Sequence, residues 1–157
     1  MLSNQEKNNR KIKFRFQKKI NLSNRIIVKQ TLLKLFKKQK KALCYLDIIF
    51  CSDEYLLDIN KANLDHDYFT DTITFDFTPK GQKETIGEIY ISADRVKENA
   101  TTYKISFQNE LLRVMIHSTL HLCGYKDKSP SQKKEMTRLE DQFIKTHQRL
   151  CSTWNKR

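Results

Sequence analysis

Two histidines lie four residues apart in a segment that is predicted to be helical. His117 and His121 fall within residues 107–122, where apolar residues recur at helical spacing. This spacing places both imidazoles on one helix face, so they can bind one cation from the same side. The helix is expected to end at Gly124, and Asp127 follows shortly after. Two imidazoles and a carboxylate suit a catalytic zinc ion with an open position, and such a set also holds iron(II).

The alternative is a pair of hydrogen-bonded helix histidines with a solvated turn aspartate. The HxxxH spacing alone favours that alternative, whereas the turn through Gly124 and the third ligand favour a metal. The other histidines look unrelated, because His66 lies in a polar loop and His147 on a polar, solvated helix face. A zinc protease is disfavoured, since Ser118 stands where the HExxH pattern has its glutamate, the general base.

Glu110 shares a helical stripe with the two histidines. It could accept a hydrogen bond from the ring nitrogen of a histidine that does not bind the metal, or it could face the substrate. An exposed glutamate that favours the positive end of the helix dipole is an equally good interpretation.

Positive charge is concentrated near the start of the chain. Residues 1–41 contain 14 lysine or arginine residues and one acid, Glu6, whereas the whole chain contains 30 basic and 18 acidic residues. The remainder is therefore close to neutral. A basic surface attracts polyanions such as nucleic acids, although a solvated face that keeps a small protein soluble explains the charge equally well.

Apolar patterns predict nine elements, in the order strand, helix, strand, helix, strand, strand and three helices. The expected strands are 12–16, 43–50, 72–77 and 86–91, with the second at the centre of the sheet. The helices begin near residues 24, 52, 92, 107 and 129, with Ser23 or Asn24 as the first cap and Ser129 with Gln132 as a capping box. This order predicts an α+β fold. It is a single domain over residues 1–157, with a small mixed four-stranded sheet packed with about five helices and a flexible segment 1–10.

Several classes of protein are excluded by composition. The apolar share is 38%, and no run approaches the length of a membrane span or a secretory signal. The four cysteines form no CxxC pair, so Cys44, Cys51, Cys123 and Cys151 are expected to be reduced, as in a cytoplasmic protein.

The segment 117–127, HSTLHLCGYKD, resembles the H-G-x-L-H-L-x-G-Y-D-H motif of the YbeY family, bacterial metal-dependent endoribonucleases that are also called rRNA maturation factors. Three more segments are similar in the same order. Residues 70–75 (TDTITF) resemble the family's T-D-V-L-S-F strand, residues 87–92 (GEIYIS) its G-D-I-x-I-S strand, and residues 109–111 (NEL) the start of its histidine helix. The resemblance covers roughly residues 43–128.

Three positions depart from the family pattern. Asp127 replaces the third histidine, and its negative charge is expected to make the ion a weaker Lewis acid. Ser118 replaces a glycine, which affects how closely a substrate can approach. Leu64 aligns with an arginine thought to contact RNA, so the basic N-terminal quarter is expected to compensate.

The resemblance implies a cytoplasmic, zinc-dependent endoribonuclease that cleaves single-stranded RNA. It also implies maturation of the 3′ end of 16S rRNA, ribosome quality control, and ribosomal proteins or a GTPase as partners. His117, His121 and Asp127 would act through the metal, which polarises a phosphoryl oxygen and lowers the pKa of a water molecule. Contacts to RNA phosphates are assigned to the first helix: Arg25, Lys29, Lys34, Lys37 and Lys38.

The main alternative is a non-catalytic ribosome-binding or RNA-binding factor with a structural metal. A metal-dependent hydrolase of small or peptide substrates is a third.

Overall fold

The computed structural model describes residues 8, 10–64 and 67–156, which contain four strands and five helices in the predicted order. The elements are β1 (Ile12–Phe16), α2 (Arg25–Lys38), β2 (Ala42–Cys51), α3 (Asp53–Leu64), β3 (Thr72–Asp76), β4 (Glu84–Ser92), α4 (Ala93–Tyr103), α5 (Phe107–Leu122) and α6 (Pro130–Trp154). The predicted α+β fold is therefore confirmed. Most of the segment expected to be flexible, and His66, lie outside the described residues.

The four strands form one mixed sheet in the order β1-β2-β4-β3. β1 and β4 run parallel to β2 on either side of it, and β3 pairs antiparallel with β4, as the predicted hairpin requires. β2 is central, as predicted, and residues 46–51 are all buried. Its long apolar run follows from this position, since a strand flanked on both sides and covered by helices has little need for polar residues.

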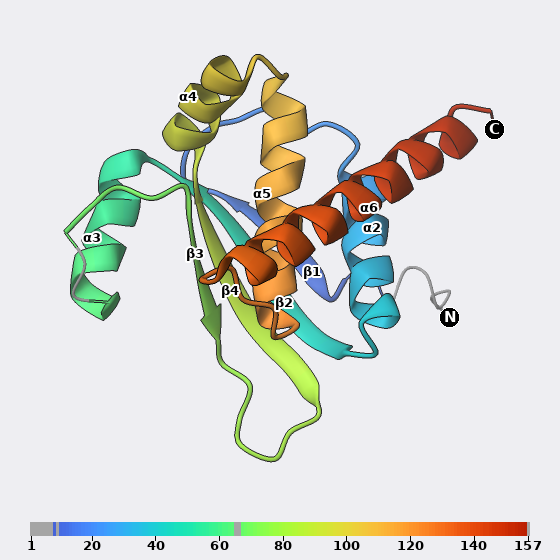
Figure 1. The fold of residues 1–157 in the computed structure, drawn as a ribbon, viewed down its shortest axis with the longest axis horizontal. Coiled ribbons are helices and arrows are strands. Elements are labelled where there is room, and N and C mark those ends of the chain that lie inside the picture. Colours follow the sequence, from blue (N-terminus) through green and yellow to red (C-terminus); the bar gives the residue numbers. More distant parts are fainter. Residues whose placement is uncertain (1–7, 9, 65–66, 157) are drawn as a thin grey trace.

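Most of the core lies on one face of the sheet. Helices α2, α5 and α6 pack there, with α6 crossing over α5 and α2 (Figure 1). Ile89 and Ile91 of β4 point into this core, whereas Ile73 and Cys51 belong to a smaller cluster under α3. The expectation of a sheet covered mainly on one side is confirmed. Among the described helices, none is both long and apolar enough to cross a bilayer.

Two contacts hold α5 close above β3 and β4. A Cβ atom at Gly87 would lie 2.8 Å from Leu122 Cδ1 and 3.3 Å from the Phe75 carbonyl oxygen, so glycine leaves room for the end of α5 to pack directly on β4. The Ser118 and Thr72 hydroxyls are 2.8 Å apart and tie the middle of α5 to β3. These contacts hold His117 and His121 of α5 over the β3 edge of the sheet.

Serine hydroxyls cap four of the helices. Ser52, Ser92, Ser106 and Ser129 each accept a hydrogen bond from the backbone three residues ahead, and Gln132 completes the predicted capping box at Ser129. The predicted side-chain cap of α2 is wrong. Asn24 occupies the cap position but makes no capping bond, because its backbone is left-handed (φ 53°) rather than extended as in a typical capping residue. Its side-chain amide nitrogen lies 3.8 Å from Cys151 Sγ.

Candidate metal centre

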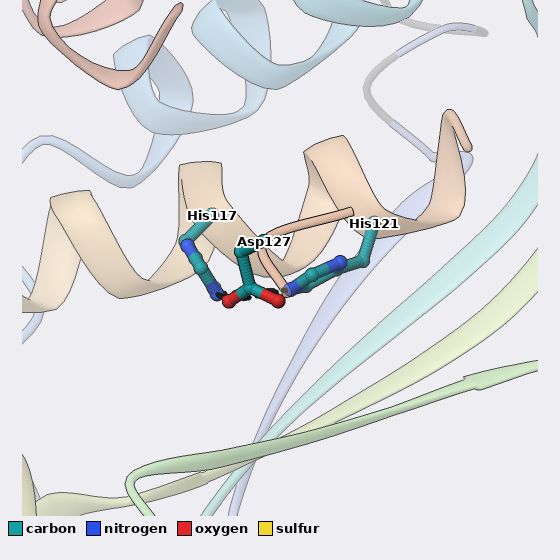
Figure 2. A group of neighbouring side chains, drawn as sticks. All are labelled: His117, His121 and Asp127. Carbon is teal, nitrogen blue, oxygen red and sulfur yellow. Dashed lines mark hydrogen bonds and ion pairs between the residues drawn. The ribbon is translucent and has the colours of Figure 1, made fainter. Parts of the chain in front are cut away.

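The two histidines of α5 and the aspartate after it converge on one point. The Nε2 atoms of His117 and His121 are 2.9 Å apart, and Asp127 Oδ2 lies 3.5 Å and 3.7 Å from them. Figure 2 shows the three side chains pointing toward one another. One potential ligand atom from each residue lies within 4.8 Å of the others. The structure therefore brings together the three residues that the sequence singles out.

The bend that returns Asp127 to the helix depends on a glycine. Gly124 has φ +99°, a left-handed conformation that side chains rarely adopt, as the sequence predicts for this position. The Gly124 amide donates to the His121 carbonyl, and the Tyr125 amide donates to that of Leu120. The Tyr125 hydroxyl also donates to Gln39 Oε1, at 2.7 Å, which anchors the bend to the end of α2.

Hydrogen bonds on the far side of each imidazole fix which nitrogen faces the cluster. His117 Nδ1 lies 2.7 Å from Glu140 Oε1, and His121 Nδ1 lies 2.9 Å from the carbonyl oxygen of Tyr125. A carbonyl and a carboxylate can only accept, so both Nδ1 atoms donate. When both imidazoles are neutral, the two Nε2 atoms carry no proton and face each other beside a carboxylate. These ligand atoms repel one another unless they share a proton or a metal ion, so the three residues fit a metal ion.

Glu140 is the site residue that the sequence analysis missed. It lies on α6, is 8% exposed, and its other oxygen accepts from Arg113 Nη1 at 3.0 Å. Burial lowers the pKa of His117, but the hydrogen bond and charge of Glu140 outweigh it, so the pKa of His117 is raised overall. A signal was available, because Glu140 lies among the apolar residues of α6 that face the core, where an acid is out of place.

Glu110 is neither an exposed residue nor a hydrogen-bond partner of the histidines. It is 4% exposed, so the idea of an exposed glutamate at the helix start is wrong. It also does not support a histidine, since both Nδ1 atoms already have other partners. Its Oε2 is buried without a hydrogen-bond partner among the described residues. Burial raises the pKa of Glu110, against the opposing effect of nearby Arg113.

A polar cleft of about 630 Å³ opens beside the cluster. The cluster residues form one wall, and the polar side of β3 forms another through Thr72, Thr74 and Asp76. Ser118 does not face this cleft, because it is fully buried against β3. The serine that replaces the family's glycine therefore does not restrict the approach of a substrate.

The basic residues of α2 lie apart from the cleft. Arg25, Lys34, Lys37 and Lys38 are exposed and Lys29 is half-buried, but none of them lines the cleft. α2 packs on the other side of α5 from β3 (Figure 1), and only its C-terminal end comes near the bend through the bond between Gln39 and Tyr125. The side chain of Leu64 lies outside the described part of the structure.

The other described histidine, His147, and the four cysteines lie in surroundings that indicate a structural role. His147 is half-buried with Nδ1 3.0 Å from Thr31 Oγ1, so the prediction that it is solvated is wrong, and burial lowers its pKa. All four cysteines are free thiols. Burial raises the pKa of Cys51 and Cys123 to about 12, which makes both thiols inert.

The fold and the cluster together define a small α+β protein whose His-His-Asp site opens on a polar cleft, an arrangement typical of metal-dependent hydrolases. The family model described as Endoribonuclease YbeY matches residues 3–148. The chain therefore belongs to the YbeY family.

Curated relatives and a solved structure agree with this assignment. An Endoribonuclease YbeY from Cytophaga hutchinsonii is 48% identical over 76% of this chain and 83% of its own length. One from Karelsulcia muelleri is 38% identical over 85% and 93%. The solution structure of TM1509 from Thermotoga maritima superposes with a TM-score of 0.59 at 25% identity, covering 92% of this chain and 93% of that one.

Proposed function

We propose that this chain is a zinc-dependent endoribonuclease of the cytoplasm that cleaves single-stranded RNA, with His117, His121 and Asp127 as the metal ligands. The observation that carries the proposal is the pair of Nε2 atoms that face each other, 2.9 Å apart beside a carboxylate. The relatives' names supply the reaction, since each is called an endoribonuclease. In keeping with the family, we assign its natural substrate to the 3′ end of 16S rRNA and its role to ribosome maturation and quality control.

The residues of this chain have distinct tasks in that reaction. Zinc bound by the three ligands supplies the Lewis acidity that phosphodiester hydrolysis needs at neutral pH. Glu140 keeps the proton of His117 on Nδ1, and the Tyr125 carbonyl does the same for His121. The hydroxyls of Thr72 and Thr74 line the cleft and offer hydrogen bonds to a ribose or phosphate.

Affinity for the RNA backbone is assigned to exposed cations. Lys128 lines the cleft, and Lys37 and Lys38 lie at the end of α2 that reaches the bend. Contacts of this kind hold phosphates without selecting a sequence. Ribosomal proteins or a GTPase are the protein partners that the family relationship would bring to the same complex.

The test is cleavage of a labelled single-stranded RNA by the metal-loaded protein. His117→Ala and His121→Ala should abolish cleavage while RNA binding survives, and a chelator should do the same reversibly. A 2′,3′-cyclic phosphate at the product end identifies the ribose hydroxyl as nucleophile, and a 3′-hydroxyl with a 5′-phosphate identifies water. Metal-loaded protein that binds RNA and never cleaves it would instead establish a non-catalytic RNA-binding factor.

A further inference from the structure

A groove of about 350 Å³ lies at the edge of the sheet farthest from the metal cluster. It runs between β1, the edge strand, and the first half of α2. Its volume falls at the lower end of the range for small-ligand sites, about 300–1,000 Å³. The cleft beside the metal cluster lies over β3, the opposite edge of the sheet, so the groove is a separate feature.

The groove has the charge of a site for a polyanion. Among the described residues that line it, four are cationic and none is acidic. The cations are Lys13 and Arg15 from β1 and Arg25 and Lys29 from α2. Arg15 is held in place by Asp47, with Nε 2.6 Å from Oδ2. Lys13 and Arg15 alternate with Phe14 and Phe16 along β1, so their side chains turn to the other face of the sheet, where Lys13 Nζ lies over the Tyr45 ring. Arg25 and Lys29 of α2 are the cations on the same side as the two rings, and they can bind phosphates there.

Aromatic rings lie beside Arg25 and Lys29. Phe16 is 36% exposed and stacks on Phe50 with ring centroids 5.2 Å apart. The Arg25 guanidinium lies over the Phe16 ring, 4.5 Å from its centroid, and Lys29 Nζ lies 5.4 Å from that of Phe14. Rings and guanidinium planes that are held in this way are the surfaces on which unpaired bases stack.

We infer that this groove binds a single-stranded segment of RNA, with a base stacked at the Phe16–Arg25 pair and the flanking phosphates on Arg25 and Lys29. A duplex does not fit this role, because its bases are already stacked on one another. The inference rests on the proposed function in taking RNA as the polymer. It adds a second contact site at the far edge of the sheet, which holds nucleotides outside the segment that is cleaved.

An extended acidic peptide is the competing occupant, since β1 is an edge strand to which another strand can be added. The paired ring and guanidinium favour a base, because a nucleobase offers a larger aromatic face for stacking than a peptide bond does. The two occupants differ in one measurable respect. RNA binding at this groove depends on the bases, whereas binding by charge or by strand addition does not.

The test is fluorescence anisotropy of the full chain in chelator, so that binding is measured without hydrolysis. The probes are a labelled oligouridylate and an abasic strand of equal length. Phe16→Ala should weaken oligouridylate binding about fivefold or more and leave abasic binding nearly unchanged. The matched control is Phe77→Ala, an exposed ring on another edge that does not line the groove. Equal binding by both variants, or an equal loss for both probes, overturns the inference.

A second pair of variants guards against loss of folding by Phe16→Ala. Ile26 lines the groove and is 50% exposed, whereas Ile105 is 38% exposed and lies elsewhere. Ile26→Glu should weaken RNA binding and Ile105→Glu should not. Displacement of the RNA by oligoglutamate with no dependence on bases would assign the groove to a peptide and refute the inference. If the chain cleaves RNA while both groove variants bind like wild type, the inference fails and the proposed function stands.

Discussion

Replacing Glu140 tests whether the residue behind His117 controls the metal centre. Its carboxylate accepts from His117 Nδ1 at 2.7 Å and from Arg113 Nη1 at 3.0 Å, in a site that is 8% exposed. Loss of such a partner releases the imidazole to rotate or to move its proton onto Nε2. Residues in this position typically contribute a factor of about 10–100 in metal affinity, which corresponds to about 1.4–2.7 kcal/mol. We expect Glu140→Ala to lose that much, and Glu140→Gln to lose less because its amide oxygen still accepts.

The assay is competition for zinc between the protein and a chromophoric chelator. Asp141→Asn is the matched control, because Asp141 also pairs with Arg113, at 3.2 Å, but does not touch His117. It should bind zinc like wild type. Equal zinc affinities for wild type, Glu140→Ala and Asp141→Asn would show that the bond to Glu140 does not position the ligand.

Three further predictions concern the supports of the site. The pKa of Glu110 is raised in the folded protein, so its protonated form stabilises the fold. This contribution is complete below about pH 4.5, the usual pKa, and is lost as the pH rises through the pKa of the folded protein. Glu110→Gln should therefore raise the melting temperature at neutral pH and lose this advantage near pH 4; an unchanged difference across that range would refute it. Gly124→Ala should cost about 1–2 kcal/mol in denaturant unfolding and weaken zinc binding, whereas Gly81→Ala, at a similar φ of +87° in the β3–β4 loop, should cost stability alone. Gly87→Val should destabilise the fold by about 1–3 kcal/mol, because its side chain meets the end of α5, and a wild-type melting curve would contradict this.

The features that could be predicted from the sequence are those encoded over a few residues. The spacing of His117 and His121 places both on one face of α5, and Gly124 marks the bend that returns Asp127. Alternating apolar residues located the strands, and β2 could be placed at the centre because its run is apolar throughout. Each of these signals depends on backbone geometry within one element or one turn, so no tertiary information is needed to read it.

The features that were missed depend on contacts between distant segments. Glu140 meets His117 across two helices and 23 residues of sequence, and nothing near either residue specifies that meeting. The partner of His147, Thr31, lies 116 residues away. The side-chain cap of α2 failed for a different reason, since Asn24 has a left-handed backbone and not the extended one that a capping residue typically adopts.

Anomalous diffraction at the zinc edge, from crystals of the full chain grown with zinc, tests the central claim most directly. The account predicts one strong peak about 2.0–2.2 Å from the Nε2 atoms of His117 and His121 and from a carboxylate oxygen of Asp127. It also predicts that this peak is lost in His117→Ala crystals. A peak at other residues, or a zinc ion held by the histidines while Asp127 points into solvent, would contradict it.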